Sequence, residues 1–289
     1  MGNLKVKLLE QSISGASRLQ GRLVNFTRRM QHHLAAARYH PRRDDVFVAT
    51  YPKSGTTWMQ MIVYQLLTDG DLELGHINDF APHLEVELIF SMADLEPMPS
   101  PRVFKTHMGY PFIFRGPGKY IYVVRHGLDV AISYYHHYQT YFHFAGSFEQ
   151  FFEMFLRGEV QFGPWFSHVA DWINNKYGLN LLLLRYEDLL ADLEGGIRKV
   201  ATHLDVDLAS KDLPRILDRC GFAFMKENEG KFDPGKRVKA PTAEANNHFI
   251  RKGKAGGWKD IIIPEQLDGY RQEFEKTMAA LDLKEYCPA

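Results

Sequence analysis

The residues from 51 to 58 read Tyr-Pro-Lys-Ser-Gly-Thr-Thr-Trp, and they restrict the fold of this chain more than any other segment. The run from Val46 to Thr50 before them is typical of a short buried strand. Apolar residues recur at helical spacing after them, at Trp58, Met61, Ile62 and Leu66. A turn between a buried strand and a helix directs backbone N–H groups toward the strand end, where the helix dipole favours an anion. The pattern therefore predicts a phosphate-binding turn of a nucleotide-binding protein rather than an ordinary strand-to-helix turn.

The position of Lys53 distinguishes this turn from a Walker A loop. A Walker A loop has the pattern G-x-x-x-x-G-K-[ST], in which the lysine follows the second glycine. Here Lys53 precedes Gly55, and no glycine lies four or five residues upstream. Lys53 supplies a point charge, Gly55 lets the backbone approach a ligand, and Thr56 and Thr57 offer hydroxyls at the helix N-terminus. An ATP or GTP hydrolase is therefore disfavoured.

The rest of the chain alternates short apolar runs with helical stretches. We expect strands at 46–50, 102–105, 120–124 and 179–184, and helices at 56–68, 128–143, 147–157, 164–177, 195–204, 210–219 and 264–281. Buried strands separated by helices imply a parallel sheet. Without a repeat or a linker, this predicts a single α/β domain with a P-loop-like central parallel sheet flanked by helices. The glycine-rich and charged segment 226–259 is expected to form one long loop.

Composition excludes several classes of partner. The 35 basic and 35 acidic residues cancel, so no global field recruits nucleic acid. Cys220 and Cys287 form neither a disulfide framework nor a metal pair, and the His32-His33 and His136-His137 pairs lack the spacing of a metal site. We therefore expect no metal. Without a run of about 18 apolar residues or a signal-peptide core, a cytoplasmic protein is expected.

Positive charge gathers at the N-terminus. Residues 1–43 carry nine Lys or Arg residues against Glu10 alone. We expect a basic N-terminal extension over 1–43 and a catalytic domain over 44–289. A basic amphipathic arm can contact anionic lipid, but the pattern favours a solvated extension that folds back on the acidic body.

Three further motifs carry chemistry. His107, in the run Lys105-Thr106-His107, follows an expected strand, where residues of a parallel sheet face the ligand crevice, and is a candidate general base. Arg125 ends the next strand, and Ser133 lies eight residues further on, so the two can converge on one phosphate. The third motif is the basic turn Arg251-Lys252-Gly253, which by itself is only a weak signal.

The four motifs, in this order along the chain, resemble those of the cytosolic sulfotransferases. The resemblance implies that 3′-phosphoadenosine 5′-phosphosulfate (PAPS) is the donor and adenosine 3′,5′-bisphosphate the product. The turn 51–58, through Lys53, Ser54, Gly55, Thr56 and Thr57, would hold the 5′-phosphosulfate. Other matched positions would hold the 3′-phosphate (Arg125, Ser133, Arg251, Lys252, Gly253) and the purine (Trp58, Tyr186, Phe222, Met225). Catalysis would fall to His107 as base, with Lys53, Lys105 and Ser133.

The sequence gives the least information about the identity of the acceptor. By analogy with the same family, the substrate pocket would contain Phe80, His83, His107, His137, Tyr138 and Phe142. His83 and His137 stand where phenol-type relatives tend to carry Phe, so a more polar or differently shaped pocket is expected, for the hydroxyl or amine of a small hydrophobic or aromatic acceptor. The segment 259–268 departs from the family's dimerisation motif at Ile263-Pro264, which leaves a homodimer open. A P-loop-type kinase and a non-catalytic nucleotide-binding module remain the alternatives.

Overall fold

A four-stranded parallel sheet forms the centre of the molecule. The computed structural model describes residues 39–68, 70, 73–85, 95–235, 248–281, 283 and 286. The strand order is β2-β1-β3-β4, and every neighbouring pair is parallel. The strands are β1 (Val46–Thr50), β2 (Val103–Thr106), β3 (Lys119–Val124) and β4 (Asn180–Arg185), each within one residue of the sequence-based bounds. This confirms the predicted α/β fold with a parallel sheet.

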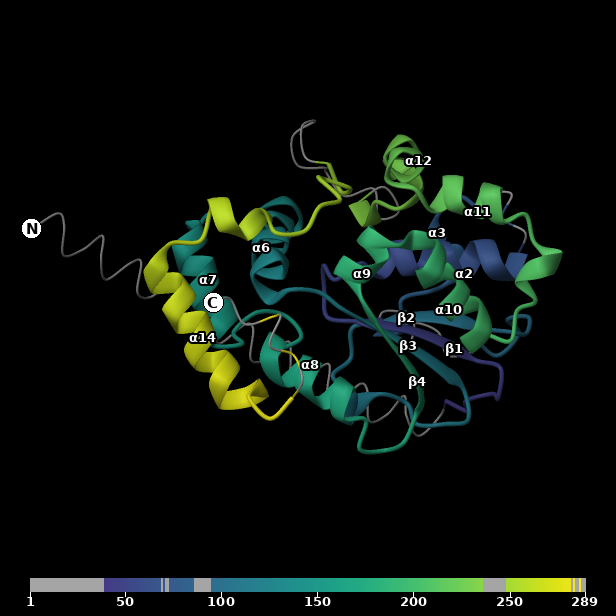
Figure 1. The fold of residues 1–289 in the computed structure, drawn as a ribbon, viewed down its shortest axis with the longest axis horizontal. Helices are drawn as coiled ribbons and strands as arrows, with labels where there is room; N and C mark the ends of the chain where they lie inside the picture. The colour runs from purple at the N-terminus through teal and green to yellow at the C-terminus, as the bar shows by residue number, and fades with distance from the viewer. Residues whose placement is uncertain are drawn as a thin grey trace, which may run out of the picture.

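Alternate residues of the strands belong to two separate hydrophobic cores. Phe47 and Ala49 of β1 point into one core, whereas Val46 and Val48 point into the other. The first core takes residues from helices α6 (Gly127–Phe142), α7 (Phe148–Leu156), α8 (Trp165–Asn174) and α14 (Pro264–Met278). The second takes residues from α2 (Thr56–Thr68), α3 (Ile77–Phe80), α9 (Tyr186–Ala191), α10 (Leu193–His203), α11 (Leu213–Cys220) and α12 (Phe222–Glu227). Figure 1 shows these two groups of helices on either side of the molecule.

Short helical elements account for most differences from the sequence-based assignment. The helices α3, α9 and α12 were not expected, because each spans fewer than two full turns and shows too little periodicity. The single loop predicted for 226–259 instead contains helical turns η3 (Glu229–Lys231) and η4 (Gly257–Asp260), while residues 236–247 lie outside the described part. Two further turns are η1 (Tyr110–Phe112) and η2 (Leu208–Ser210).

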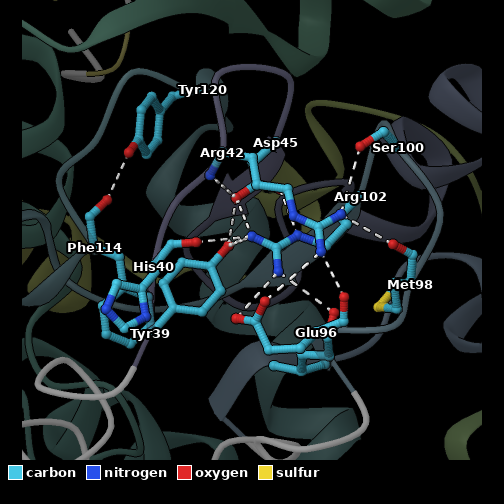
Figure 2. Close-up of polar contacts among 11 residues, drawn as sticks. Tyr39, His40, Arg42, Asp45, Glu96, Met98, Ser100, Arg102, Phe114 and Tyr120 are labelled. Carbon is cyan, nitrogen blue, oxygen red and sulfur yellow. Dashed lines mark hydrogen bonds and ion pairs between the residues drawn. The ribbon is translucent and has the colours of Figure 1, made fainter.

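A buried ion pair fastens the amino-terminal edge of the sheet (Figure 2). Arg102 is fully buried, and its Nε and Nη2 atoms donate to the two Asp45 carboxylate oxygens, each at 2.7 Å. The Tyr39 hydroxyl and the Arg42 backbone N–H both donate to Asp45 Oδ2, also at 2.7 Å. Asp45 immediately precedes β1, and Arg102 immediately precedes β2. The network therefore joins these two strands at their starts. Residues 39–43 therefore pack on the folded domain, whereas 1–38 of the predicted extension lie outside the described residues.

Candidate active site

A cavity of about 920 Å³ opens at the carboxyl-terminal edge of the sheet. Lys53 follows β1, His107 follows β2, Arg125 follows β3 and Tyr186 follows β4, so all four strand ends contribute to its wall. Of the sequence-predicted site residues, those that line the cavity are Lys53, Gly55, Thr56, Thr57, Trp58, His83, Lys105, His107, Arg125, Ser133, His137, Phe142, Tyr186, Phe222, Met225, Arg251, Lys252 and Gly253. The structure thus brings together residues that lie far apart along the chain.

The turn after β1 has two residues with left-handed backbone conformations. Lys53 and Gly55 both have positive φ angles, 69° and 97°. A Cβ atom on Gly55 would lie 2.8 Å from Cδ2 of Tyr186, so this position needs glycine for space as well as for conformation. The helix α2 begins at Thr56, and its first backbone N–H groups lack partners within the helix. Ser54 is fully buried below the turn, and its Oγ atom has no hydrogen-bond partner among the described residues.

Cations gather around this turn. Lys53, Lys105, Arg125, Arg251 and Lys252 all line the cavity. The Arg125 guanidinium donates to the backbone oxygens of Lys53 (3.0 Å) and Lys254 (3.1 Å). Burial, together with the charges of Arg251, Arg125 and Lys105, lowers the pKa of Lys53 to about 7. Like charges held this close repel one another, and an anionic ligand with more than one phosphate would relieve that repulsion.

The imidazole of His107 is held in one tautomer. Its Nδ1 atom lies 2.9 Å from the Thr50 backbone oxygen, which only accepts hydrogen bonds, so Nδ1 carries the proton. The other ring nitrogen, Nε2, therefore has a free lone pair. Burial and the neighbouring His83 lower the pKa of His107 well below its usual value, which keeps the imidazole neutral at physiological pH. A neutral imidazole lining a cavity is suited to take a proton from a hydroxyl.

Glu85 supports this histidine and was missed by sequence reasoning. One carboxylate oxygen of Glu85 accepts the backbone N–H of His107 and the Thr106 hydroxyl, the latter at 2.9 Å. The other lies 3.1 Å from Nε2 of His83. Burial alone would raise the pKa of Glu85, but the attraction and hydrogen bond of His83 outweigh it and hold that pKa at about 2. Glu85 is thus an ionised carboxylate behind the two histidines.

Aromatic side chains form another part of the cavity wall. Trp58 donates its indole N–H to the Cys220 backbone oxygen at 2.8 Å, and its ring meets the Tyr186 ring edge-on at 5.4 Å between centroids. Phe222 is 46% exposed, which is unusual for a large apolar residue. A Cβ atom on Gly253 would lie 2.3 Å from the Phe222 ring. The exposed aromatic faces and this close approach are suited to stacking on a flat base.

The carboxylate of Asp129 fixes the segment that carries Arg251, a role that the sequence did not reveal. Asp129, in the first turn of α6, accepts the backbone N–H groups of Gly256 (2.7 Å) and Trp258 (3.2 Å). This holds the chain around Gly253 against the start of α6. The contact joins residues far apart in sequence, so no local pattern signals it.

Two residues predicted for the substrate pocket do not line the cavity. Tyr138 lies on the side of α6 that faces α7, where its ring packs 5.0 Å from that of Phe151 and its hydroxyl accepts the Gln161 N–H. Phe80 ends α3 and packs 5.0 Å from the Tyr64 ring. Phe162, which was not predicted, takes a place in the wall, with its ring 5.2 Å from that of His107.

The described residues contain neither a metal-binding cluster nor a membrane-spanning helix. No group of three or more His, Cys, Asp or Glu side chains in that part of the chain is arranged to hold a metal ion. Among the described helices, none has the length and hydrophobicity needed to cross a bilayer.

Comparison with known proteins gives one consistent result. The family model described as "Sulfotransferase domain" matches residues 43–282. Mouse sulfotransferase 1B1 is 35% identical over 259 residues, covering 84% of this chain and 85% of the relative. Mouse sulfotransferase 1 family member D1 is 33% identical over 270 residues, covering 88% and 90%. Retinol dehydratase, solved with retinol and PAP, superposes with a TM-score of 0.75 at 27% identity over 84% of each chain. Mouse sulfotransferase SULT7A1, complexed with PAP, gives 0.66 at 26% identity over 87% and 90%.

Proposed function

This chain belongs to the sulfotransferase domain family, and we propose that it transfers a sulfuryl group from PAPS to a hydroxyl or amine of a small hydrophobic or aromatic acceptor. Its relatives are enzymes that move sulfuryl groups, and two similar solved structures contain PAP. The donor supplies an activated sulfuryl group whose leaving group is an adenosine bisphosphate. The acceptor side of the proposal rests on the residues around His107.

The cavity wall fits such a donor at both of its ends. The N–H groups at the start of α2 and the Lys53 ammonium would hold the 5′-phosphosulfate. A second set of polar residues would hold the 3′-phosphate, namely Arg125, Ser133, Arg251, Lys252 and Gly253. The purine would lie among Trp58, Tyr186, Phe222 and Met225. The clustered cations support this assignment, because they need an anion to offset their repulsion.

The proposed chemistry depends on the tautomer and the charge of the His107 imidazole. With Nδ1–H donated to Thr50, Nε2 would take the proton of the acceptor hydroxyl. Lys53 and Lys105 line the same cavity and would stabilise charge that grows on the departing oxygen and the moving group. Sulfuryl transfer of this kind depends mainly on alignment and charge stabilisation, as phosphoryl transfer does.

Thermal shift assays test the choice of donor. A ligand that binds only the folded protein raises its apparent stability. Adenosine 3′,5′-bisphosphate and PAPS should raise the melting temperature, whereas ATP should have little effect. A larger shift with ATP and Mg²⁺ would instead favour the P-loop-type kinase. Stabilisation by PAPS without turnover across an acceptor screen would favour the non-catalytic module.

A substitution tests the role of the base. We expect His107→Ala to keep the thermal shift with adenosine 3′,5′-bisphosphate and to lower kcat by about 10²–10⁴-fold. His203→Ala, at the end of α10 and away from the cavity, is the matched control and should keep full turnover. An active His107→Ala enzyme would remove His107 from the mechanism.

A further inference from the structure

His168 is a buried histidine on α8 that does not line the cavity. Its Nε2 atom lies 3.2 Å from the backbone oxygen of His107. A backbone oxygen only accepts hydrogen bonds, so Nε2 of His168 carries the proton and donates it. One helical turn further along α8, the Trp172 indole donates to the next backbone oxygen, that of Met108, at 3.1 Å. The main chain that follows β2 is therefore fixed on α8 at two successive residues.

Tyr122 selects the tautomer of His168 that makes this bond. The Tyr122 hydroxyl lies 2.9 Å from Nδ1 of His168. Because Nε2 carries the only ring proton of the neutral imidazole, Nδ1 accepts and the hydroxyl donates. Burial lowers the pKa of His168 to about 4, which keeps the ring neutral at physiological pH. Each ring nitrogen of His168 thus has one defined partner.

His107 is held at three points by three different parts of the chain. Glu85 accepts its backbone N–H, and His168 donates to its backbone oxygen. Its own Nδ1–H group is donated to the Thr50 oxygen. A general base must stand within about 2.6–3.2 Å of the atom that gives up the proton, and a misplacement of about 1 Å can cost about a hundredfold in rate. A peptide unit that loses one of these contacts can rotate and carry the imidazole with it.

We propose that His168 is a positioning residue for the base, which it holds through the backbone carbonyl of His107. The proposal rests on the sulfotransferase activity and on the base role of His107 proposed above. Because His168 does not line the cavity, its effect reaches the reaction only through His107. Its replacement should therefore slow the chemical step and leave the binding of donor and acceptor unchanged.

Four variants test the proposal, with PAPS as donor and, as acceptor, 2-naphthol or the fastest compound of the acceptor screen. His168→Leu removes the hydrogen-bond donor, whereas His168→Gln keeps an amide N–H at about the place of Nε2. Tyr122→Phe removes only the hydroxyl that selects the tautomer. Tyr120→Phe is its matched control, because Tyr120 lies two residues earlier on β3, is equally buried, and donates its hydroxyl to the Phe114 oxygen at 2.6 Å.

We expect His168→Leu to lower kcat by about tenfold to a hundredfold. The KM for the acceptor and the affinity for adenosine 3′,5′-bisphosphate should stay within about twofold of the wild type. His168→Gln should recover most of kcat. Tyr122→Phe should lower kcat by about twofold to fivefold, whereas Tyr120→Phe should keep it, although each of these two variants loses one buried hydrogen bond.

A double variant separates an effect through His107 from general damage to the site. In His107→Ala the base is already absent, so the addition of His168→Leu should change kcat by less than about twofold. A further loss of about tenfold or more in this background would overturn the role of His168. A His168→Leu enzyme with full kcat would do the same, and so would one that loses nucleotide affinity as strongly as kcat.

The remaining outcomes are distinguished by the same assays. Should His168→Leu give no thermal shift with adenosine 3′,5′-bisphosphate and so prove unfolded, equal kcat values for Tyr122→Phe and Tyr120→Phe would overturn the proposal. A fully active His107→Ala enzyme would refute it together with the base role, while its PAPS-dependent turnover would leave the sulfotransferase activity standing. Absence of turnover by the wild type with every acceptor of the screen would overturn both proposals.

Discussion

Proton uptake should accompany nucleotide binding, because Lys53 has a pKa of about 7 in the free protein. The neighbouring Arg251, Arg125 and Lys105 help to hold the pKa at this value, and a ligand with two phosphates would offset their charges. Binding should therefore raise the pKa of Lys53 toward that of an ordinary lysine. At about pH 7 half of the Lys53 side chains are charged before binding, and at about pH 8 only about a tenth are.

The expected size of the effect follows from this titration. Binding of adenosine 3′,5′-bisphosphate should take up about 0.5 proton at pH 7 and about 0.9 at pH 8. Its affinity should fall about fivefold between these two pH values, because the charged form of Lys53 becomes scarce. The phosphates themselves contribute little at pH 8, since their second pKa is about 6.

Isothermal titration calorimetry in buffers with different ionisation enthalpies measures this uptake. Lys53→Met should abolish it. Lys252→Met removes a solvent-exposed cation of the same cavity and should lower the affinity equally at both pH values while keeping the uptake. Binding enthalpies that do not depend on the buffer at pH 8 would show that Lys53 does not gain a proton on binding, and the reasoning would then be wrong.

Three further substitutions probe other parts of the structure. Arg102→Met leaves the buried Asp45 carboxylate unpaired and should cost about 3–5 kcal/mol in chemical denaturation, with partial recovery in the double variant with Asp45→Leu; an unchanged midpoint would contradict this. Gly253→Ala adds a Cβ atom 2.3 Å from the Phe222 ring, at a residue whose φ is 57°. Binding of adenosine 3′,5′-bisphosphate should therefore weaken more than tenfold. In the control Gly230→Ala the added atom meets nothing within 4 Å, so this variant should bind as the wild type does. Glu85→Gln should lower kcat by about tenfold to a hundredfold through misplacement of His107, with nucleotide affinity retained; equal loss of both would indicate a general structural role.

The sequence predicted those parts of the site that depend on neighbouring residues. The turn at 51–58 and the strand-end positions of His107 and Arg125 could be read from apolar runs and glycine spacing alone. The order of strands in a parallel sheet then places these strand ends at one edge. The expected strands are consequently accurate to one residue.

Residues whose position depends on tertiary contacts could not be predicted in this way. Glu85 reaches His107 because the chain from Pro82 runs beside β2, where the Lys105 N–H donates to the Pro82 oxygen at 3.0 Å. Phe162 reaches the cavity from an irregular segment with a φ of 70°. Tyr138 was wrongly placed because its helical phase directs it to the core around α7. No local periodicity encodes the positions of Glu85 and Phe162, whereas the direction of Tyr138 follows from the period of the predicted helix.

The crowded cations of the cavity imply a conflict between the thermal stability of the protein and its activity. Burial and the charge of Arg251 lower the pKa of Lys53, and burial and the charge of Arg125 lower that of Arg251, so replacement of Lys53 or Arg251 by an apolar residue of similar size relieves repulsion among these cations. A library of variants selected only for heat resistance should accumulate changes at these two positions and lose affinity for the donor. Thermostable forms of this enzyme are therefore better sought by engineering away from the carboxyl-terminal edge of the sheet.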